Sequence, residues 1–72
     1  MIKFTLRGDY IELNKLLKAT SLCPSGGAAN QAITQGLVKV DGLTELRKAR
    51  KIRLGQQVEL NGNMILIGKE NP

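Results

Sequence analysis

Hydrophobic and polar residues follow two different patterns in the first third of the chain. Residues 2–6 alternate between hydrophobic and polar side chains, which predicts a short strand with one buried face. The sequence Asp9-Tyr10-Ile11-Glu12 then has the form of a capping box, in which an acid at the helix start is followed by a glutamate three residues later. Three leucines follow at helical spacing, namely Leu13, Leu16 and Leu17. These features predict a first helix over residues 10–19.

A second helical pattern follows a short connection. Ser25 is suited to the N-cap because its hydroxyl can accept a hydrogen bond from a backbone N–H of the first turn. Ala29, Ala32 and Ile33 are spaced to form the inner face of this helix. Gly36 is expected to adopt the left-handed conformation that commonly ends a helix. The sequence therefore predicts two short helices in succession.

The second half of the chain has the pattern of β-hairpins. Asp41-Gly42 separates two runs rich in hydrophobic residues, and Asp-Gly in this setting is the strongest local hairpin signal. Asn61-Gly62-Asn63 separates a second pair of such runs. We therefore expect an α+β fold, in which two short helices pack on a small, mostly antiparallel sheet of four to five strands. Residues 69–72 are expected to fray.

Length and cysteine content limit the organisation of the chain. Its 72 residues are enough for one domain, so we expect residues 1–72 to form a single domain. The chain has no run of about 18 apolar residues, which is the length needed to span a membrane, and residues 1–7 lack the apolar stretch of a signal peptide. Cys23 is the only cysteine, which excludes an intrachain disulfide and fits a reducing compartment. We expect a cytoplasmic protein in which Cys23 is buried as a small hydrophobic residue.

The net charge is concentrated in one segment. The chain has 11 Lys and Arg residues against 6 Asp and Glu residues, which gives a net charge of +5. Residues 47–53 contain five basic and no acidic residues, so the rest of the chain is balanced in charge. A cluster of like charges raises the free energy of the folded chain by self-repulsion, and a bound polyanion relieves it. We therefore expect this segment to contact phosphate groups.

Five side chains of this segment are the first candidates for phosphate contacts, namely Arg47, Lys48, Arg50, Lys51 and Arg53. Arginine is favoured because its guanidinium can donate two hydrogen bonds to one phosphate. Three lysines would extend the patch if the first helix and the first hairpin lie beside it, namely Lys15, Lys18 and Lys39. Two structural alternatives stay open. The segment could be a solvated loop held open by repulsion, or a strand with Arg50, Ile52 and Leu54 on one face.

The sequence Ser25-Gly26-Gly27 is a second candidate contact. Glycine is a poor helix former, yet two glycines fall in the predicted first turn of the second helix. They leave backbone N–H groups open at the positive end of the helix dipole, which readily accepts a phosphate. Gln31, further along the helix, can donate to phosphate or ribose. The structural alternative is that one glycine permits the close approach of another segment.

The residue types that the chain lacks narrow the function. It contains no histidine and one cysteine, so we expect no zinc site, no cofactor and no catalytic histidine. We therefore expect a binding protein and not an enzyme. Phe4 and Tyr10 are the only aromatic residues, and Phe4 is expected in the core. Because single-strand binders rely on aromatic stacking, recognition of the backbone and shape of a folded RNA is favoured.

The order of these motifs resembles a known family. Residues 11–18, the Ser25-Gly26-Gly27 turn, the hairpin over residues 36–42 and the strand over residues 55–60 are similar to the S-four domain. This RNA-binding module is named for ribosomal small-subunit protein four. The resemblance covers residues 10–60 and implies an αL-type motif, in which two helices and the adjoining loop grip structured RNA such as ribosomal or transfer RNA. It also indicates the stand-alone bacterial branch, whose members carry a Ser-Gly-Gly turn before the second helix.

The chain departs from the family pattern at one place. Many members carry arginine and other basic residues at the start of the second helix, where this chain has Ser-Gly-Gly-Ala-Ala-Asn-Gln over residues 25–31. The resemblance therefore places less of the binding on side chains there. It shifts the contact to the backbone N–H groups of that turn and to residues 47–53.

Two other functions stay open. A DNA-binding module would need a helix that presents base-reading side chains, and the second helix offers Asn30, Gln31 and Gln35. A small protein-interaction subunit would instead dock on an acidic partner through residues 47–53. A membrane partner is not expected, because no basic amphipathic helix with a bulky apolar face occurs. No small-molecule substrate is expected either, since we do not expect an enzyme. We favour an RNA-binding protein that contacts the phosphate backbone of structured RNA, ribosomal or transfer RNA, through its basic patch, and ribosome association is one such role.

Overall fold

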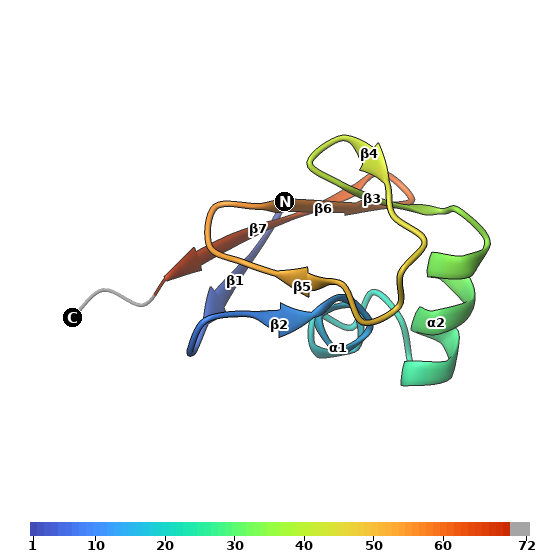
Figure 1. Ribbon diagram of the computed structural model, residues 1–72, viewed down its shortest axis with the longest axis horizontal. Coiled ribbons are helices and arrows are strands. Elements are labelled where there is room, and N and C mark those ends of the chain that lie inside the picture. The colour runs from blue at the N-terminus through green and yellow to red at the C-terminus, as the bar shows by residue number, and fades with distance from the viewer. Residues whose placement is uncertain (70–72) are drawn as a thin grey trace.

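Seven strands and two helices follow one another in the computed structural model, which describes residues 1–69. The strands are β1 (Ile2–Leu6), β2 (Ile11–Glu12), β3 (Val38–Val40), β4 (Leu43–Thr44), β5 (Lys51–Ile52), β6 (Gln57–Leu60) and β7 (Asn63–Lys69). The helices are α1 (Leu13–Ala19) and α2 (Gly26–Thr34). Figure 1 shows both helices on one side of the main sheet, with β2 and β5 on that same side.

Five strands form the main sheet, in the order β1-β7-β6-β3-β4. β1 pairs in parallel with β7, whereas the other neighbouring strands pair antiparallel. This arrangement confirms the prediction of two helices on a small, mostly antiparallel sheet. A separate two-stranded sheet of β2 and β5 was not predicted.

Both predicted hairpins are confirmed. Val40 lies opposite Leu43, so Asp41 and Gly42 form a two-residue turn, with φ angles of 50° and 84°. Residues 61 and 62 connect β6 to β7 in the same way, with φ angles of 52° and 79°. Two successive positive φ angles are the mark of the type I′ turn, which suits the twist of the flanking strands. Asn63, expected in the turn, is the first residue of β7.

The first helix begins later than predicted, and Asp9 does not cap it. β2 takes the place of the expected first turn, and α1 starts at Leu13 without a side-chain cap. The backbone N–H of Leu13 donates to the carbonyl oxygen of Arg50 at 2.9 Å, and that of Asn14 donates to the carbonyl oxygen of Lys48 at 3.1 Å. A distant segment thus satisfies N–H groups that are usually left to a local cap. The capping-box prediction is wrong because this tertiary pairing overrides a local signal.

Both ends of α2 agree with the prediction. Ser25 Oγ accepts a hydrogen bond from a first-turn N–H at 3.1 Å. At the other end Gly36 has a φ of 79°, and its N–H donates to the carbonyl of Ile33. The N–H of Leu37 donates to the carbonyl of Ala32. This pair of bonds is a Schellman motif, which requires the left-handed residue that glycine supplies.

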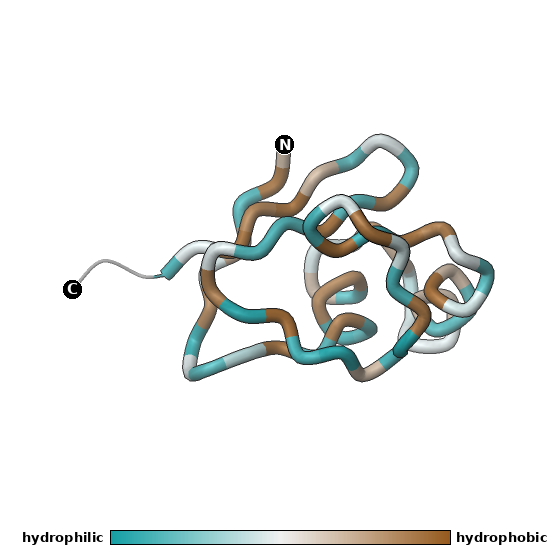
Figure 2. Tube along the Cα trace, turned by 45° about the horizontal axis from the view of Figure 1, so that its top comes forward, coloured by the Kyte–Doolittle hydropathy of each residue, from teal (hydrophilic) through white to brown (hydrophobic). Residues whose placement is uncertain are grey.

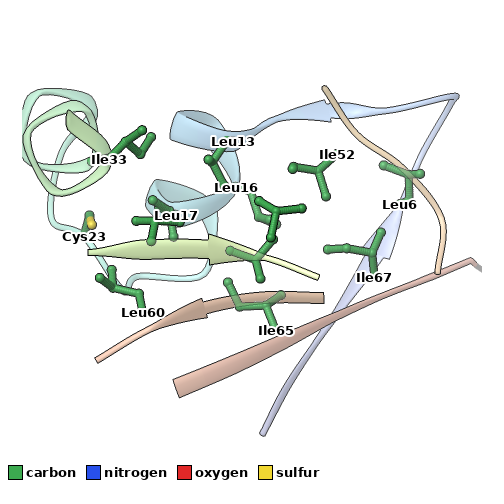
Figure 3. Close-up of a cluster of buried hydrophobic side chains, with 14 residues drawn as sticks. Leu6, Leu13, Leu16, Leu17, Cys23, Ile33, Ile52, Leu60, Ile65 and Ile67 are labelled. Carbon is green, nitrogen blue, oxygen red and sulfur yellow. The ribbon is translucent and has the colours of Figure 1, made fainter. Parts of the chain in front are cut away.

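The core lies between the main sheet and the helices (Figure 3). Its buried residues are Leu6, Leu13, Leu16, Leu17, Cys23, Ala29, Ile33, Val38, Val40, Ile52, Val58, Leu60, Ile65 and Ile67. Figure 3 shows Ile52 of β5 pointing into the same cluster as Leu13 and Ile67. Hydrophilic positions are frequent along the connecting loops (Figure 2). Cys23 is buried as predicted, and burial raises the pKa of its thiol.

The last described residues belong to the sheet. β7 extends through Lys69, which lies opposite Leu6, so the prediction that fraying starts at residue 69 is wrong. The rest of that prediction concerns residues 70–72, which lie outside the described residues. Within residues 1–69, neither helix is long and apolar enough to cross a membrane. The same residues contain no group of three or more potential metal ligands.

Candidate nucleic-acid interface

Residues 47–53, hereafter the basic segment, run along the start of α1 and are fixed there. The carbonyl oxygens of Lys48 and Arg50 accept the two α1 hydrogen bonds described above. Immediately after them β5 pairs with β2, and Ile52 is fully buried. The segment is therefore neither a free loop nor a regular strand. Of the three residues expected on one face, Ile52 is buried, Arg50 is partly buried and Leu54 is 54% exposed.

Glu45 neutralises part of the basic segment from within the fold. This residue is only 7% exposed, and its Oε1 accepts a hydrogen bond from Nη1 of Arg50 at 2.6 Å. Its Oε2 accepts the Nε–H of Arg47 at 3.0 Å and the backbone N–H of Arg47 at 3.1 Å. The side-chain hydrogen bonds from Arg47 are the largest cause that lowers the pKa of Glu45 from 4.5 to about 2. The repulsion that we expected a polyanion to relieve is therefore already reduced by this carboxylate.

Gln56 fixes the other end of the basic segment. Its Oε1 accepts the backbone N–H of Arg53 at 2.8 Å, and its Nε2 donates to Oδ2 of Asp41 at 3.0 Å. Oδ1 of Asp41 accepts the backbone N–H of Gln57 at 2.9 Å. The hydrogen bond from Gln57, followed by that from Gln56, lowers the pKa of Asp41. The turn of the first hairpin thus holds the end of the segment in place.

Three cations of the basic segment are exposed and form no ion pair with any residue in 1–69, namely Lys48, Lys51 and Arg53. The side chain of Arg47 is 72% exposed although it binds Glu45, whereas that of Arg50 is 31% exposed. Four of the five cations line one open depression together with Ala49 and Gln56, and Lys48 is the one that does not. The surface can therefore present several charges to one extended anion.

Tyr10 joins the basic segment, which the sequence did not predict. Nζ of Lys51 lies 4.9 Å and Cζ of Arg53 lies 5.6 Å from the centroid of the Tyr10 ring. Both distances lie in the range of cation–π interactions, and Tyr10 is 43% exposed. Residue 10 leads directly into β2, so the pairing of β2 with β5 brings its ring to the two cations. The only sequence signal for this contact was that residues 10–12 could form an extended strand. The capping-box interpretation assigned them to a helix instead.

Lys15 and Lys18 are both exposed on α1. Nζ of Lys15 lies 2.8 Å from Oε1 of Glu12, and this contact raises the pKa of Lys15. Glu12 in turn lies opposite Lys51 in the pairing of β2 with β5. The structure therefore places Lys15 beside the basic segment.

Lys39 does not lie with the other candidate cations. It stands on β3 between Val38 and Val40, which are both buried against the helices. Successive side chains of a strand point to opposite faces of the sheet, so Lys39 points to the face away from the helices. The basic segment lies on the helix side of the sheet, and Lys39 does not extend it (Figure 1).

The first turn of α2 has room for a side chain at both of its glycines. Leaving aside chain neighbours and the backbone of the helix itself, a Cβ added to Gly26 would meet no atom within 4 Å, and one added to Gly27 would meet only Oγ of Ser25 at 3.9 Å. The alternative that a glycine permits the close approach of another segment is therefore wrong. Neither glycine has a positive φ. Neither local packing nor backbone conformation therefore explains why glycine occupies these two positions.

Asn14 connects both helices to the basic segment. Its Nδ2 donates to Oδ1 of Asn30 on α2 at 3.0 Å, and its Oδ1 accepts the backbone N–H of Lys15 at 2.8 Å. Its own backbone N–H donates to Lys48. Gln31 follows Asn30 on α2 and is exposed. Two helices and one basic segment therefore form a continuous hydrogen-bonded unit.

Known proteins are similar to this chain in sequence and in fold. The family model of the S4 domain matches residues 4–68. YbcJ of Escherichia coli is 41% identical over 68 residues, which cover 93% of this chain and 97% of YbcJ. The tyrosine–tRNA ligase of Ralstonia nicotianae is 44% identical over 50 residues, which cover 69% of this chain and 13% of the ligase.

The structural comparison agrees with these matches. The solution structure of YbcJ from E. coli, described as revealing an αL motif involved in RNA binding, has a TM-score of 0.73 and 40% sequence identity. It covers 94% of this chain, and the match takes in 87% of the YbcJ structure. The family model and the identity to YbcJ establish what the sequence resemblance implied: the chain belongs to the S4 domain family.

Proposed function

We propose that this chain binds structured RNA through its phosphate backbone. The basic segment carries the proposal: α1 and Gln56 hold its backbone in place, while Lys48, Lys51 and Arg53 stay exposed. A segment whose backbone is fixed before binding loses less conformational entropy when the partner arrives. A nucleic acid suits such a surface because every neutralised phosphate also releases condensed counterions.

The relatives support RNA as the nucleic acid. The αL motif of YbcJ is described as involved in RNA binding, and a segment of the tyrosine–tRNA ligase is similar to this chain. We propose ribosomal or transfer RNA as the class of target, met in the bacterial cytoplasm, with association with the ribosome as one such setting. Residues 1–72 would act as one binding domain, without catalysis.

The candidate residues have different parts in this proposal. Arg47, Lys48, Lys51 and Arg53 contact phosphates, and Lys15 and Lys18 extend the contact along α1. Arg50 contributes mainly by fixing the segment on Glu45. Ser25, Gly26 and Gly27 form a second contact through the open backbone of the first α2 turn, with Gln31 beside them. Lys39 is left out because it points to the other face of the sheet.

A titration at several salt concentrations tests the proposal. The full chain is added to a labelled hairpin RNA and to a duplex DNA of the same sequence, and binding is followed by fluorescence anisotropy. We expect tighter binding to the RNA. We also expect Lys48→Gln and Lys51→Gln each to lower the salt slope of log K by about one, as the loss of one phosphate contact predicts.

Lys39→Gln is the matched control, because it removes the same charge from the other face of the sheet. We expect its salt slope to stay close to that of the unmodified chain. If Lys39→Gln lowers the slope as much as Lys51→Gln, net charge alone drives binding and the interface is wrongly placed. A preference for the DNA would contradict RNA as the target.

A further inference from the structure

The only two aromatic residues of the chain line the same hollow. Phe4 of β1 and Tyr10 border an open hollow on the surface beside β1. The remaining lining residues are Thr5, Leu6, Arg7 and Ile11. The volume of the hollow is about 330 Å³. This is near the lower end of the range for sites that hold small organic groups, which is roughly 300–1,000 Å³.

The lining of the hollow is apolar and aromatic apart from Thr5 and the exposed cation Arg7. Leu6 in this lining is buried. Nζ of Lys51 and Cζ of Arg53 lie over the ring of Tyr10, and both residues line the depression of the basic segment. Tyr10 therefore stands between the hollow and the basic segment.

A nucleotide combines the two properties that this arrangement would accept. Its base is flat and stacks on aromatic rings, and its phosphates are anionic. We propose that the hollow receives one unpaired base of the bound RNA, stacked against Tyr10, while the adjoining phosphates lie on Lys51 and Arg53. This inference rests on the proposed function and specifies the class of RNA, namely a folded RNA with an unpaired nucleotide next to a helix.

A fully paired helix could not fill the hollow, because its bases are stacked on one another inside the duplex. The scarcity of aromatic residues favoured recognition of the RNA backbone and shape alone, and a site for one base is added to that expectation here. Two aromatic residues make no extended platform, but placed together they can receive a single base.

The chain itself supplies a reporter for the test. Tyr10 is the only tyrosine and there is no tryptophan, so the tyrosine emission of the full chain comes from this ring alone. The chain is titrated with three two-stranded RNAs that have no loop: a blunt-ended duplex, the same duplex with a single bulged nucleotide, and the same duplex with a short single-stranded extension. We expect saturable quenching of Tyr10 by at least one of the two RNAs with unpaired nucleotides, and no quenching by the blunt-ended duplex at equal absorbance.

Two variants separate stacking from the other contacts of the ring. Tyr10→Phe keeps an aromatic ring and should keep the preference for the duplex with the unpaired nucleotide. Tyr10→Leu keeps an apolar side chain and should weaken binding of that duplex by about 5- to 150-fold, the effect of losing one base–aromatic stack. Its effect on the blunt-ended duplex should be much smaller. Thermal unfolding checks that both variants are folded.

The possible outcomes distinguish this inference from the proposed function. If all three RNAs bind equally and Tyr10 emission does not change, the base site is wrong while RNA binding stands. Equal losses of affinity for all three RNAs on Tyr10→Leu would likewise overturn the base site, because the ring then acts only by holding Lys51 and Arg53. If none of the three RNAs binds, the proposed function itself fails.

Discussion

The carboxylate of Glu45 lies 2.6 Å from Nη1 of Arg50, so a nearly buried acid holds a cation of the basic segment in place. The same carboxylate binds the side chain and the backbone N–H of Arg47. One acidic side chain therefore sets the position of two of the five cations. It also reduces the repulsion between them, which lets the segment lie close to α1.

Replacing Glu45 by glutamine should destabilise the fold by about 1–2 kcal/mol. The variant keeps a hydrogen-bond acceptor but leaves Arg50 without a charged partner, and the exposure of Arg47 to solvent moderates the loss. Urea unfolding measures the change. Glu59→Gln removes the same charge from β6, where Glu59 forms no ion pair within residues 1–69, and should cost less than about 0.5 kcal/mol. Equal losses in the two variants would contradict the role given to Glu45.

Acid should remove the stabilisation that Glu45 provides. Its pKa in the folded protein is about 2, below its ordinary value of 4.5, so protons bind the unfolded chain first as the pH falls. The contribution is therefore complete above about pH 4.5 and is lost as the pH falls toward about 2. We expect the difference in unfolding free energy between the unmodified chain and Glu45→Gln to shrink over this interval. A difference that stays constant from pH 5 to about pH 2 would show that the carboxylate is not ionically paired.

Gly27→Ala should raise the stability of the protein and lower its affinity for RNA. The added methyl group has room, and alanine is the better helix former, so stability should rise by up to about 1 kcal/mol. Affinity for the hairpin RNA should fall, because the methyl group stands beside the open N–H groups of the first turn. Thermal unfolding and anisotropy give the two values on one sample. If stability rises and the affinity is unchanged, the first turn of α2 does not contact RNA.

The Asn14–Asn30 bond should couple the two helices by about 1 kcal/mol, the usual net value of one hydrogen bond. A double-mutant cycle of Asn14→Ala and Asn30→Ala measures the coupling in urea unfolding. The cycle is needed because Asn14 also accepts the N–H of Lys15, which the single variant loses as well. Additive losses would mean that the helices are held together by hydrophobic packing alone.

The elements that could be predicted from the sequence are those set by neighbouring residues. The Asp41-Gly42 turn, the Ser25 cap and the Gly36 helix end each depend on a few adjacent positions, and all three are confirmed. The prediction of where α1 starts was wrong because its first N–H groups bind the carbonyl oxygens of Arg50 and Lys48, which lie far away in the sequence. No local pattern reports such a bond.

The candidate site was predictable in composition but not in geometry. The clustering of five cations in residues 47–53 is visible by counting, and it identified the segment. In the sequence, in contrast, nothing distinguishes Glu45 from the other acidic residues, and only the fold places it beside Arg47 and Arg50. Tyr10 was assigned to a helix, and only the pairing of β2 with β5 brings it to the cations.

The parallel pairing of β1 with β7 has a consequence for how the chain folds during synthesis. β1 leaves the ribosome before β7, and within residues 1–69 it has no other partner in the main sheet. α2 and the hairpin of β3 and β4 can form from nearby residues, but β1 must wait until β7 has emerged. Long-range pairings of this kind slow folding, because the intervening loop must close first. During elongation, a nascent chain would thus keep its first hydrophobic strand unpaired until the last strand of the sheet has been synthesised.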